Sequence, residues 1–188
     1  TGLDSIVVGK EEILNEIKES IQTARETKHS GTILNKLFDS ANRIATTIRN
    51  SSKVGENTLS IGEIAVKMAE ENAGIDGKKK VLMIGTGEIA GMVAKTMKKK
   101  GYAFDITSQI IERATDFSKI LGGNPVDFLD VLAGFDKYSI IIVATTADYF
   151  IITYDKIKRV MNNYKKGMLL LDISDPRAVE ETVTQVPG

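Results

Sequence analysis

The sequence contains no cysteine and only one histidine among its 188 residues. The lack of cysteine excludes disulfides, thiolate metal sites and a cysteine nucleophile within this chain. Because a secretory signal is also missing, the composition predicts a cytoplasmic protein. The single histidine, His29, lies in a polar helix break, which favours a solvated imidazole over a catalytic base. No group of residues has the spacing of metal ligands.

An excess of one charge and long apolar runs are also missing. The 25 basic and 25 acidic side chains cancel, so net charge gives no argument for a nucleic-acid or membrane partner. The lysine clusters at 78–80 and 98–100 are interpreted as solvated surface. The longest apolar runs, 139–146 and 167–173, are far too short to span a bilayer. The chain begins at Thr1 without an initiator methionine, so we expect a longer parent protein.

The first 76 residues are predicted to be helical. Apolar residues recur at helical spacing over 10–27, 32–48 and 60–72, and the polar stretch 50–58 is predicted to be a loop. The pattern then changes near residues 73–79 to short runs of valine, isoleucine and leucine. Strands are predicted at 80–84, 103–107, 138–144 and 168–173, and helices at 88–100, 111–121, 126–133 and 154–163. This alternation predicts an α/β fold, a Rossmann-like doubly wound parallel sheet preceded by a helical segment.

A glycine-containing turn between the first strand and its helix is the strongest functional signal. In the run Gly85-Thr86-Gly87-Glu88-Ile89-Ala90, Gly85 permits the turn and Gly87 lets the backbone approach a phosphate. The small Ala90 lets the helix pack on the strand, and the helix N-terminus offers free N–H groups to an anion. The turn predicts a dinucleotide site; a packing turn without a ligand is the alternative.

The end of the second strand should read the adenosine ribose. An acidic residue there would accept from the 2′-hydroxyl of NAD, but Ser108, Gln109 and Ile110 are neutral, and Asp105 comes three residues early. Arg113 follows one helical turn beyond Gln109, which favours NADP over NAD unless Arg113 is only a surface residue.

Two further strand ends complete the predicted edge of the sheet. Ala144, Thr145 and Thr146 follow the third predicted strand, where small residues would line the nicotinamide side; a plain strand exit explains them equally well. Asp172 ends the last strand, and we interpret it as a carboxylate that caps the following loop.

Four motifs occur in one order along the chain. They are Gly-Leu-Asp-Ser at 2–5, followed by apolar residues and a helix; Gly-Thr-Gly-Glu-Ile at 85–89; Ser-Gln-Ile at 108–110 with Glu-Arg-Ala at 112–114; and Asp-Ile-x-x-Pro-Arg at 172–177. Together they resemble the motifs of glutamyl-tRNA reductase, the NADPH enzyme that begins the five-carbon route to tetrapyrroles such as heme.

The resemblance implies a domain organisation and an activity. Residues 1–50 would be the helical C-terminal part of a catalytic domain, 51–76 a loop and connecting helix, and 77–188 the NADP-binding domain. The family reduces glutamyl-tRNA to glutamate-1-semialdehyde, the precursor of 5-aminolevulinate: a Cys thiolate attacks the ester, and NADPH delivers hydride to the thioester. That Cys lies upstream of the matched segment, so this chain alone is expected to be inactive. The resemblance also implies a homodimer formed through a missing C-terminal domain, and glutamate-1-semialdehyde aminomutase as a partner.

By the same resemblance, five residues are candidates to hold the glutamyl group. They are Ser5, Lys10, Glu11, Glu12 and Glu16. Only Ser5 is a clean match, because the family carries Glu, Gln and Gln where this chain has Lys10, Glu12 and Glu16, and Arg where it has Gln109. Two other functions therefore stay open. One is another NAD(P)-dependent dehydrogenase, similar to shikimate dehydrogenase or precorrin-2 dehydrogenase, although the helical start argues against it. The other is a non-catalytic module that binds a nucleotide or a protein.

Overall fold

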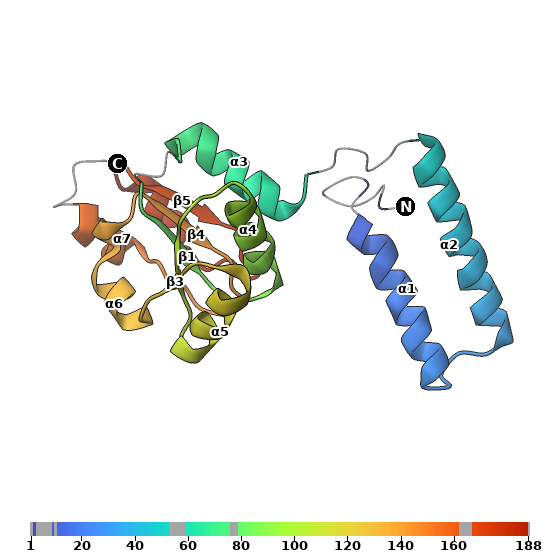
Figure 1. Cartoon of the computed structure of the whole chain (residues 1–188). Helices are drawn as coiled ribbons and strands as arrows, with labels where there is room; N and C mark the ends of the chain where they lie inside the picture. The colour runs from blue at the N-terminus through green and yellow to red at the C-terminus, as the bar shows by residue number, and fades with distance from the viewer. Residues whose placement is uncertain are drawn as a thin grey trace. The chain divides into compact units, whose positions relative to one another are not determined.

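A computed structural model divides the chain into two compact units, Thr1–Ser60 and Ile61–Gly188 (Figure 1). The structure describes residues 2, 9, 11–52, 59–75, 79–161 and 167–187.

The N-terminal unit contains a helical hairpin of α1 (Glu11–Glu26) and α2 (Thr32–Ser52). Both helices agree with the predicted periodicity, although α2 continues into the first residues of the predicted loop 50–58; the rest of that loop lies outside the described residues. Arg25 ties the two helices together, since its guanidinium donates to Asn35 Oδ1 at 3.2 Å and pairs with Asp39 at 2.6 Å. None of the α2 side chains is buried.

The C-terminal unit is built on a five-stranded parallel sheet with the strand order β3-β2-β1-β4-β5. The strands are β1 (Val81–Ile84), β2 (Asp105–Thr107), β3 (Asn124–Pro125), β4 (Ile140–Val143) and β5 (Leu169–Asp172). The predicted Rossmann-like fold is confirmed, and β3 is a short edge strand that the sequence did not predict. Ile84 pairs with Thr107 and with Val143, so β2, β1 and β4 end together at one edge of the sheet.

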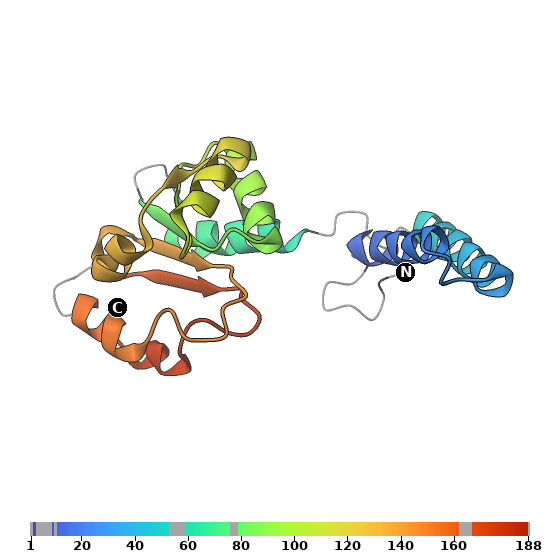
Figure 2. The ribbon, with the colours of Figure 1, turned by 90° about the horizontal axis from the view of Figure 1, so that it is seen from below.

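Helices cover both faces of this sheet (Figure 2). One layer contains α3 (Ile61–Ala73), α4 (Glu88–Lys99) and α5 (Ile111–Leu121). The opposite layer contains α6 (Phe128–Ala133), α7 (Tyr154–Met161) and the 3₁₀ turns Phe135–Lys137 and Glu181–Gln185. Because side chains alternate along a strand, Val81 and Met83 face the first layer, and Leu82 and Ile84 face the second. This two-sided burial explains the unbroken apolar runs of the sequence.

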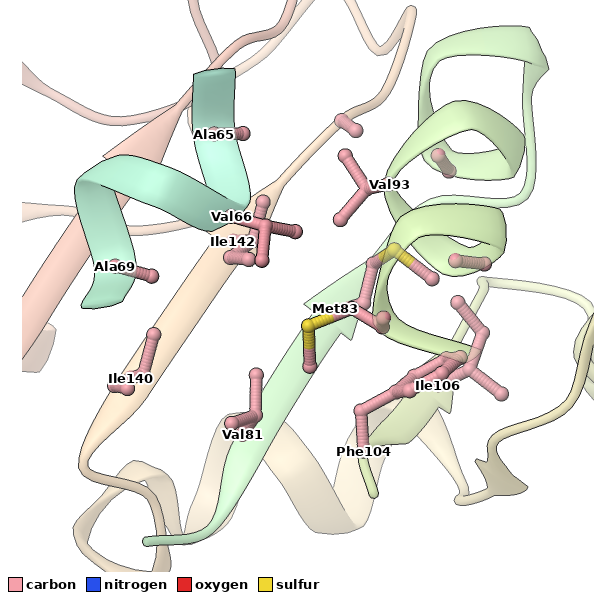
Figure 3. Close-up of a cluster of buried hydrophobic side chains, with 14 of the residues drawn as sticks. Ala65, Val66, Ala69, Val81, Met83, Val93, Phe104, Ile106, Ile140 and Ile142 are labelled. Atoms are coloured by element: carbon pink, nitrogen blue, oxygen red, sulfur yellow. The ribbon is translucent and has the colours of Figure 1, made fainter. Parts of the chain in front are cut away.

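The helix α3 lies within residues 51–76, where a loop and connecting helix are predicted, and it packs on the sheet of the C-terminal unit. Its small side chains Ala65, Val66 and Ala69 are buried beside the sheet residues Ile140 and Ile142 (Figure 3). Its first turn also lies against α4. A Cβ on Gly62 would lie 2.7 Å from the Val93 backbone nitrogen, and closer still to the carbonyl of Met92. The compact C-terminal unit, Ile61–Gly188, includes α3.

Candidate functional site

The turn that follows β1 has a conformation that requires glycine at its first position. Gly85 has a φ of +119°, and its N–H donates to the carbonyl of Thr107 at 2.9 Å. A Cβ on Gly85 would lie 2.7 Å from the carbonyl carbon of Ala144, and closer still to its oxygen. Thr86 follows, half-buried. The turn is thus held between β2 and β4, and no side chain fits at Gly85.

The second glycine leaves open space at the start of α4. Gly87 is the N-cap residue, it is exposed, and no side chain caps the helix. A Cβ built on Gly87 meets nothing within 4 Å. The first N–H groups of an α-helix have no partner inside the helix, and they carry partial positive charge. The uncapped end and the open space above it therefore fit a phosphate group.

The remaining residues of the glycine motif support α4 on the sheet. Ala90 is fully buried, in agreement with the prediction that a small residue here lets the helix pack on the strand. Ile89 packs against the same core. Glu88, the first residue of α4, is exposed.

The end of β2 lies beside this turn. Ser108 is half-buried, Gln109 is exposed, and Ile110 is the N-cap residue of α5, with no side-chain cap. Gln109 Nε2 donates to the hydroxyl of Tyr149, which comes from the loop after β4. Arg113 is exposed in the first turn of α5. Sequence reasoning missed Tyr149; its signal was an aromatic residue in the segment after β4, three positions beyond Thr146.

Asp105, the acidic residue within β2, already has two partners in the described part of the chain. Its Oδ1 accepts from Asn124 Nδ2 at 3.0 Å, and its Oδ2 accepts from the Tyr138 hydroxyl at 2.9 Å. The pKa of the Tyr138 phenol is raised, mainly because the ring is buried and also because its hydroxyl donates a hydrogen bond to Asp105. Asp105 is therefore a structural residue.

The ends of β4 and β5 are joined to each other. Ala144 is buried and its N–H donates to the carbonyl of Ile84 at 2.8 Å, whereas Thr145 is half-buried and Thr146 exposed. The Thr145 N–H donates to Ser174 Oγ at 3.2 Å, which links the two loops.

Asp172 closes the loop after β5, as predicted. Its carboxylate accepts from the backbone N–H groups of Ser174 at 3.0 Å, Ala178 at 3.0 Å and Val179 at 2.9 Å. Asp172 and Arg177 also line a hollow of about 520 Å³ between β5, α7 and the last 3₁₀ turn. This hollow lies at the β5 edge of the sheet, away from β2.

The candidate substrate residues belong to the N-terminal unit. Glu16 is exposed on α1, and Glu11 and Glu12 open that helix, but the side chains of these two lie outside the described residues. Ser5 and Lys10 also lie outside them. Within the described ranges, no cluster of acidic or histidine side chains could hold a metal ion. No helix in those ranges is long and apolar enough to cross a membrane.

Comparison with known proteins matches both units to described families. Residues 1–52 match the family model of the glutamyl-tRNAGlu reductase N-terminal domain, and residues 67–188 match the shikimate / quinate 5-dehydrogenase model. A glutamyl-tRNA reductase of Cenarchaeum symbiosum is 46% identical over 188 residues, which are 100% of this chain and 45% of that protein. The enzyme of that name from Methanothrix thermoacetophila is 30% identical over the whole chain and 45% of its own length.

Solved structures agree with this result. The glutamyl-tRNA reductase from Methanopyrus kandleri matches 98% of this chain and 47% of its own length, with a TM-score of 0.62 and 30% identity. The nucleotide-binding domain of the Thermoplasma volcanium reductase matches 65% of this chain and 81% of that structure, with a TM-score of 0.54 and 21% identity, and so supports the fold alone. The chain spans about half the length of the curated relatives it matches.

Proposed function

The chain belongs to the glutamyl-tRNA reductase family, with a C-terminal domain of the shikimate / quinate 5-dehydrogenase type, and from this premise we propose that its C-terminal unit binds NADPH. In the full-length protein, this unit would serve the reduction of glutamyl-tRNA to glutamate-1-semialdehyde. The observation that carries the proposal is the β1 turn, with Gly85 held between two strands and open space over Gly87.

The residues of the site divide by the part of the cofactor that they would hold. The backbone N–H groups at the start of α4 would bind the pyrophosphate next to Gly87. Ser108, Gln109 and Arg113 would surround the adenosine ribose, and Thr145 and Thr146 would lie along the nicotinamide half. Bound NADPH supplies a hydride for the carbonyl carbon of the substrate. The residues of this chain would position the cofactor and supply the charges that bind its phosphates.

The preference for NADPH over NADH rests on charge at the end of β2. Asp105 begins β2, two residues before the carboxyl end of the strand, and its oxygens accept from Asn124 and Tyr138, so it does not stand where an acidic residue would accept from a ribose 2′-hydroxyl. Arg113 is exposed and makes no ion pair among the described residues, so it is available to a 2′-phosphate. Glu112 precedes it, but consecutive residues of a helix point in directions about 100° apart, so the two side chains do not share a face.

Fluorescence titration with NADPH and NADH tests this proposal. We expect saturable NADPH binding, and Arg113→Ala should weaken NADPH binding about 10-fold, because it removes one charge-assisted hydrogen bond, and leave NADH binding unchanged. Glu112→Gln, a charge change at the preceding residue of α5, which points in another direction, is the matched control and should change neither. A wild-type chain without saturable binding at millimolar NADPH would contradict the proposal.

The domain type alone also fits another NAD(P)-dependent dehydrogenase. The match of residues 1–52 to a glutamyl-tRNA reductase N-terminal domain favours the reductase. Because the chain has no cysteine, we propose that it does not reduce glutamyl-tRNA by itself. Semialdehyde production by the pure chain would refute that reasoning.

A further inference from the structure

Gln109 and Tyr149 meet although they are 40 residues apart and follow different strands. Gln109 lies just beyond β2, and Tyr149 lies in the loop that follows β4. In the sheet, β1 lies between these two strands. The contact therefore joins the two loops that flank the glycine turn.

The loop that carries Tyr149 is fixed at both ends. On one side, Thr145 Oγ1 accepts from the Ala147 N–H at 3.2 Å. On the other, Ile151 is buried and its N–H donates to the carbonyl of Ala178 at 2.8 Å. Between these anchors, the Tyr149 ring stays 45% exposed. A large apolar ring is thus held at the surface beside Gln109.

We propose that Tyr149 is the stacking residue for the adenine base of the cofactor. This inference rests on the proposed NADPH site. In a sheet of this type the adenosine half of a dinucleotide lies beyond β2, where Gln109 is placed. A glutamine offers no aromatic or guanidinium plane to a base, but the phenol ring that contacts it does. Ile110, which follows Gln109 and is 47% exposed, adds a second apolar surface at the same strand end.

The test compares variants of the full chain by titration with NADPH and with its two halves. Base stacking on an aromatic side chain corresponds to a loss of about 5- to 100-fold on alanine substitution. We expect Tyr149→Ala to show a loss in this range for NADPH and for adenosine 2′,5′-bisphosphate. Binding of reduced nicotinamide mononucleotide should stay unchanged. Tyr149→Phe keeps the ring and should lose less than about threefold.

Phe150→Ala is the matched control, because Phe150 is the next residue in the same loop and is 48% exposed. It should bind NADPH as the wild type does, and circular dichroism should show that all variants are folded. Equal affinity of Tyr149→Ala and wild type would overturn the inference and leave the NADPH site standing. An equally large loss in Tyr149→Phe, or in Phe150→Ala, would also overturn it. A wild-type chain that binds no NADPH would overturn both proposals.

Discussion

The two glycines of the β1 turn should respond oppositely to the same substitution. Gly85→Ala places a methyl group against the Ala144 carbonyl and forces an L residue to a φ of +119°. Gly87→Ala places the same group in open space, at a φ of −79° that any residue adopts. We expect Gly85→Ala to damage the fold and Gly87→Ala to damage cofactor binding.

The expected sizes follow from these two environments. At Gly85, an unfavourable backbone conformation costs about 1–3 kcal/mol and overpacking against backbone costs about 1–3 kcal/mol. The free energy of unfolding should therefore fall by about 2–6 kcal/mol, which is much of the 5–15 kcal/mol typical of a domain. At Gly87, alanine is only a poorer N-cap, so the fold should lose about 1 kcal/mol or less. The methyl group would, however, occupy the place of the phosphate, and NADPH affinity should fall at least about 10-fold.

Tyrosine fluorescence gives an assay confined to the relevant unit. All five tyrosines of the sequence lie after residue 100, so urea unfolding followed by tyrosine emission reports the C-terminal unit alone. The emission of bound NADPH measures affinity in the same samples. If Gly85→Ala unfolds at the wild-type urea concentration, the strained turn described here is wrong. If Gly87→Ala binds NADPH normally, the phosphate does not lie over α4.

Three further outcomes are expected. Gly62→Ala should destabilise the C-terminal unit by about 1–3 kcal/mol and speed hydrogen exchange in α3, because its Cβ would press on the α4 backbone; unchanged exchange would contradict that packing. Hydrogen bonds from Lys100 and, to a lesser extent, from Tyr102 lower the pKa of Glu70. The ionised carboxylate therefore stabilises the fold above its ordinary pKa of 4.5, and this stabilisation is lost as the pH falls through the lower pKa of the folded state. The urea midpoint of Glu70→Gln should vary less with pH in this range than that of the wild type, and an identical pH profile would refute the argument. Asp172→Asn should cost about 2–3 kcal/mol in the same urea assay, because an amide cannot accept all three backbone N–H groups, whereas the exposed Asp175→Asn should change little.

Local pattern was sufficient for much of the fold. Three of the four predicted strands, β1, β4 and β5, carry apolar residues on both faces, and burial on both sides of a parallel sheet leaves that signature in the sequence. The β3 strand left none, because Asn124-Pro125 is only two residues long and lies at the sheet edge. The apolar face of α3 could also be predicted, but periodicity does not say which surface a helix covers. The glycine at position 62 lets the first turn of α3 lie against the backbone of α4.

The candidate site also has a part that local sequence predicts and a part that depends on the order of the strands. The sequence predicted the local environments of Gly85, Gly87 and Ala90, because a turn, an uncapped helix end and a close packing contact each restrict the residue type at one position. The bond between Gln109 and Tyr149 was not found, since it joins two loops that only the sheet order brings together. Cofactor choice and the substrate residues Ser5, Lys10, Glu11, Glu12 and Glu16 stay predictions.

The packing of α3 determines where this protein can be divided. A truncated gene that starts at Ile61 retains Ala65, Val66 and Ala69, which shield Ile140 and Ile142 from water. One that starts at residue 77 lacks this cover and exposes the apolar residues of β4 and β5 that α3 packs on, so that they can associate with other copies. Expression of the shorter fragment should therefore yield aggregates, and the longer fragment is the appropriate starting material for crystallisation with a ligand.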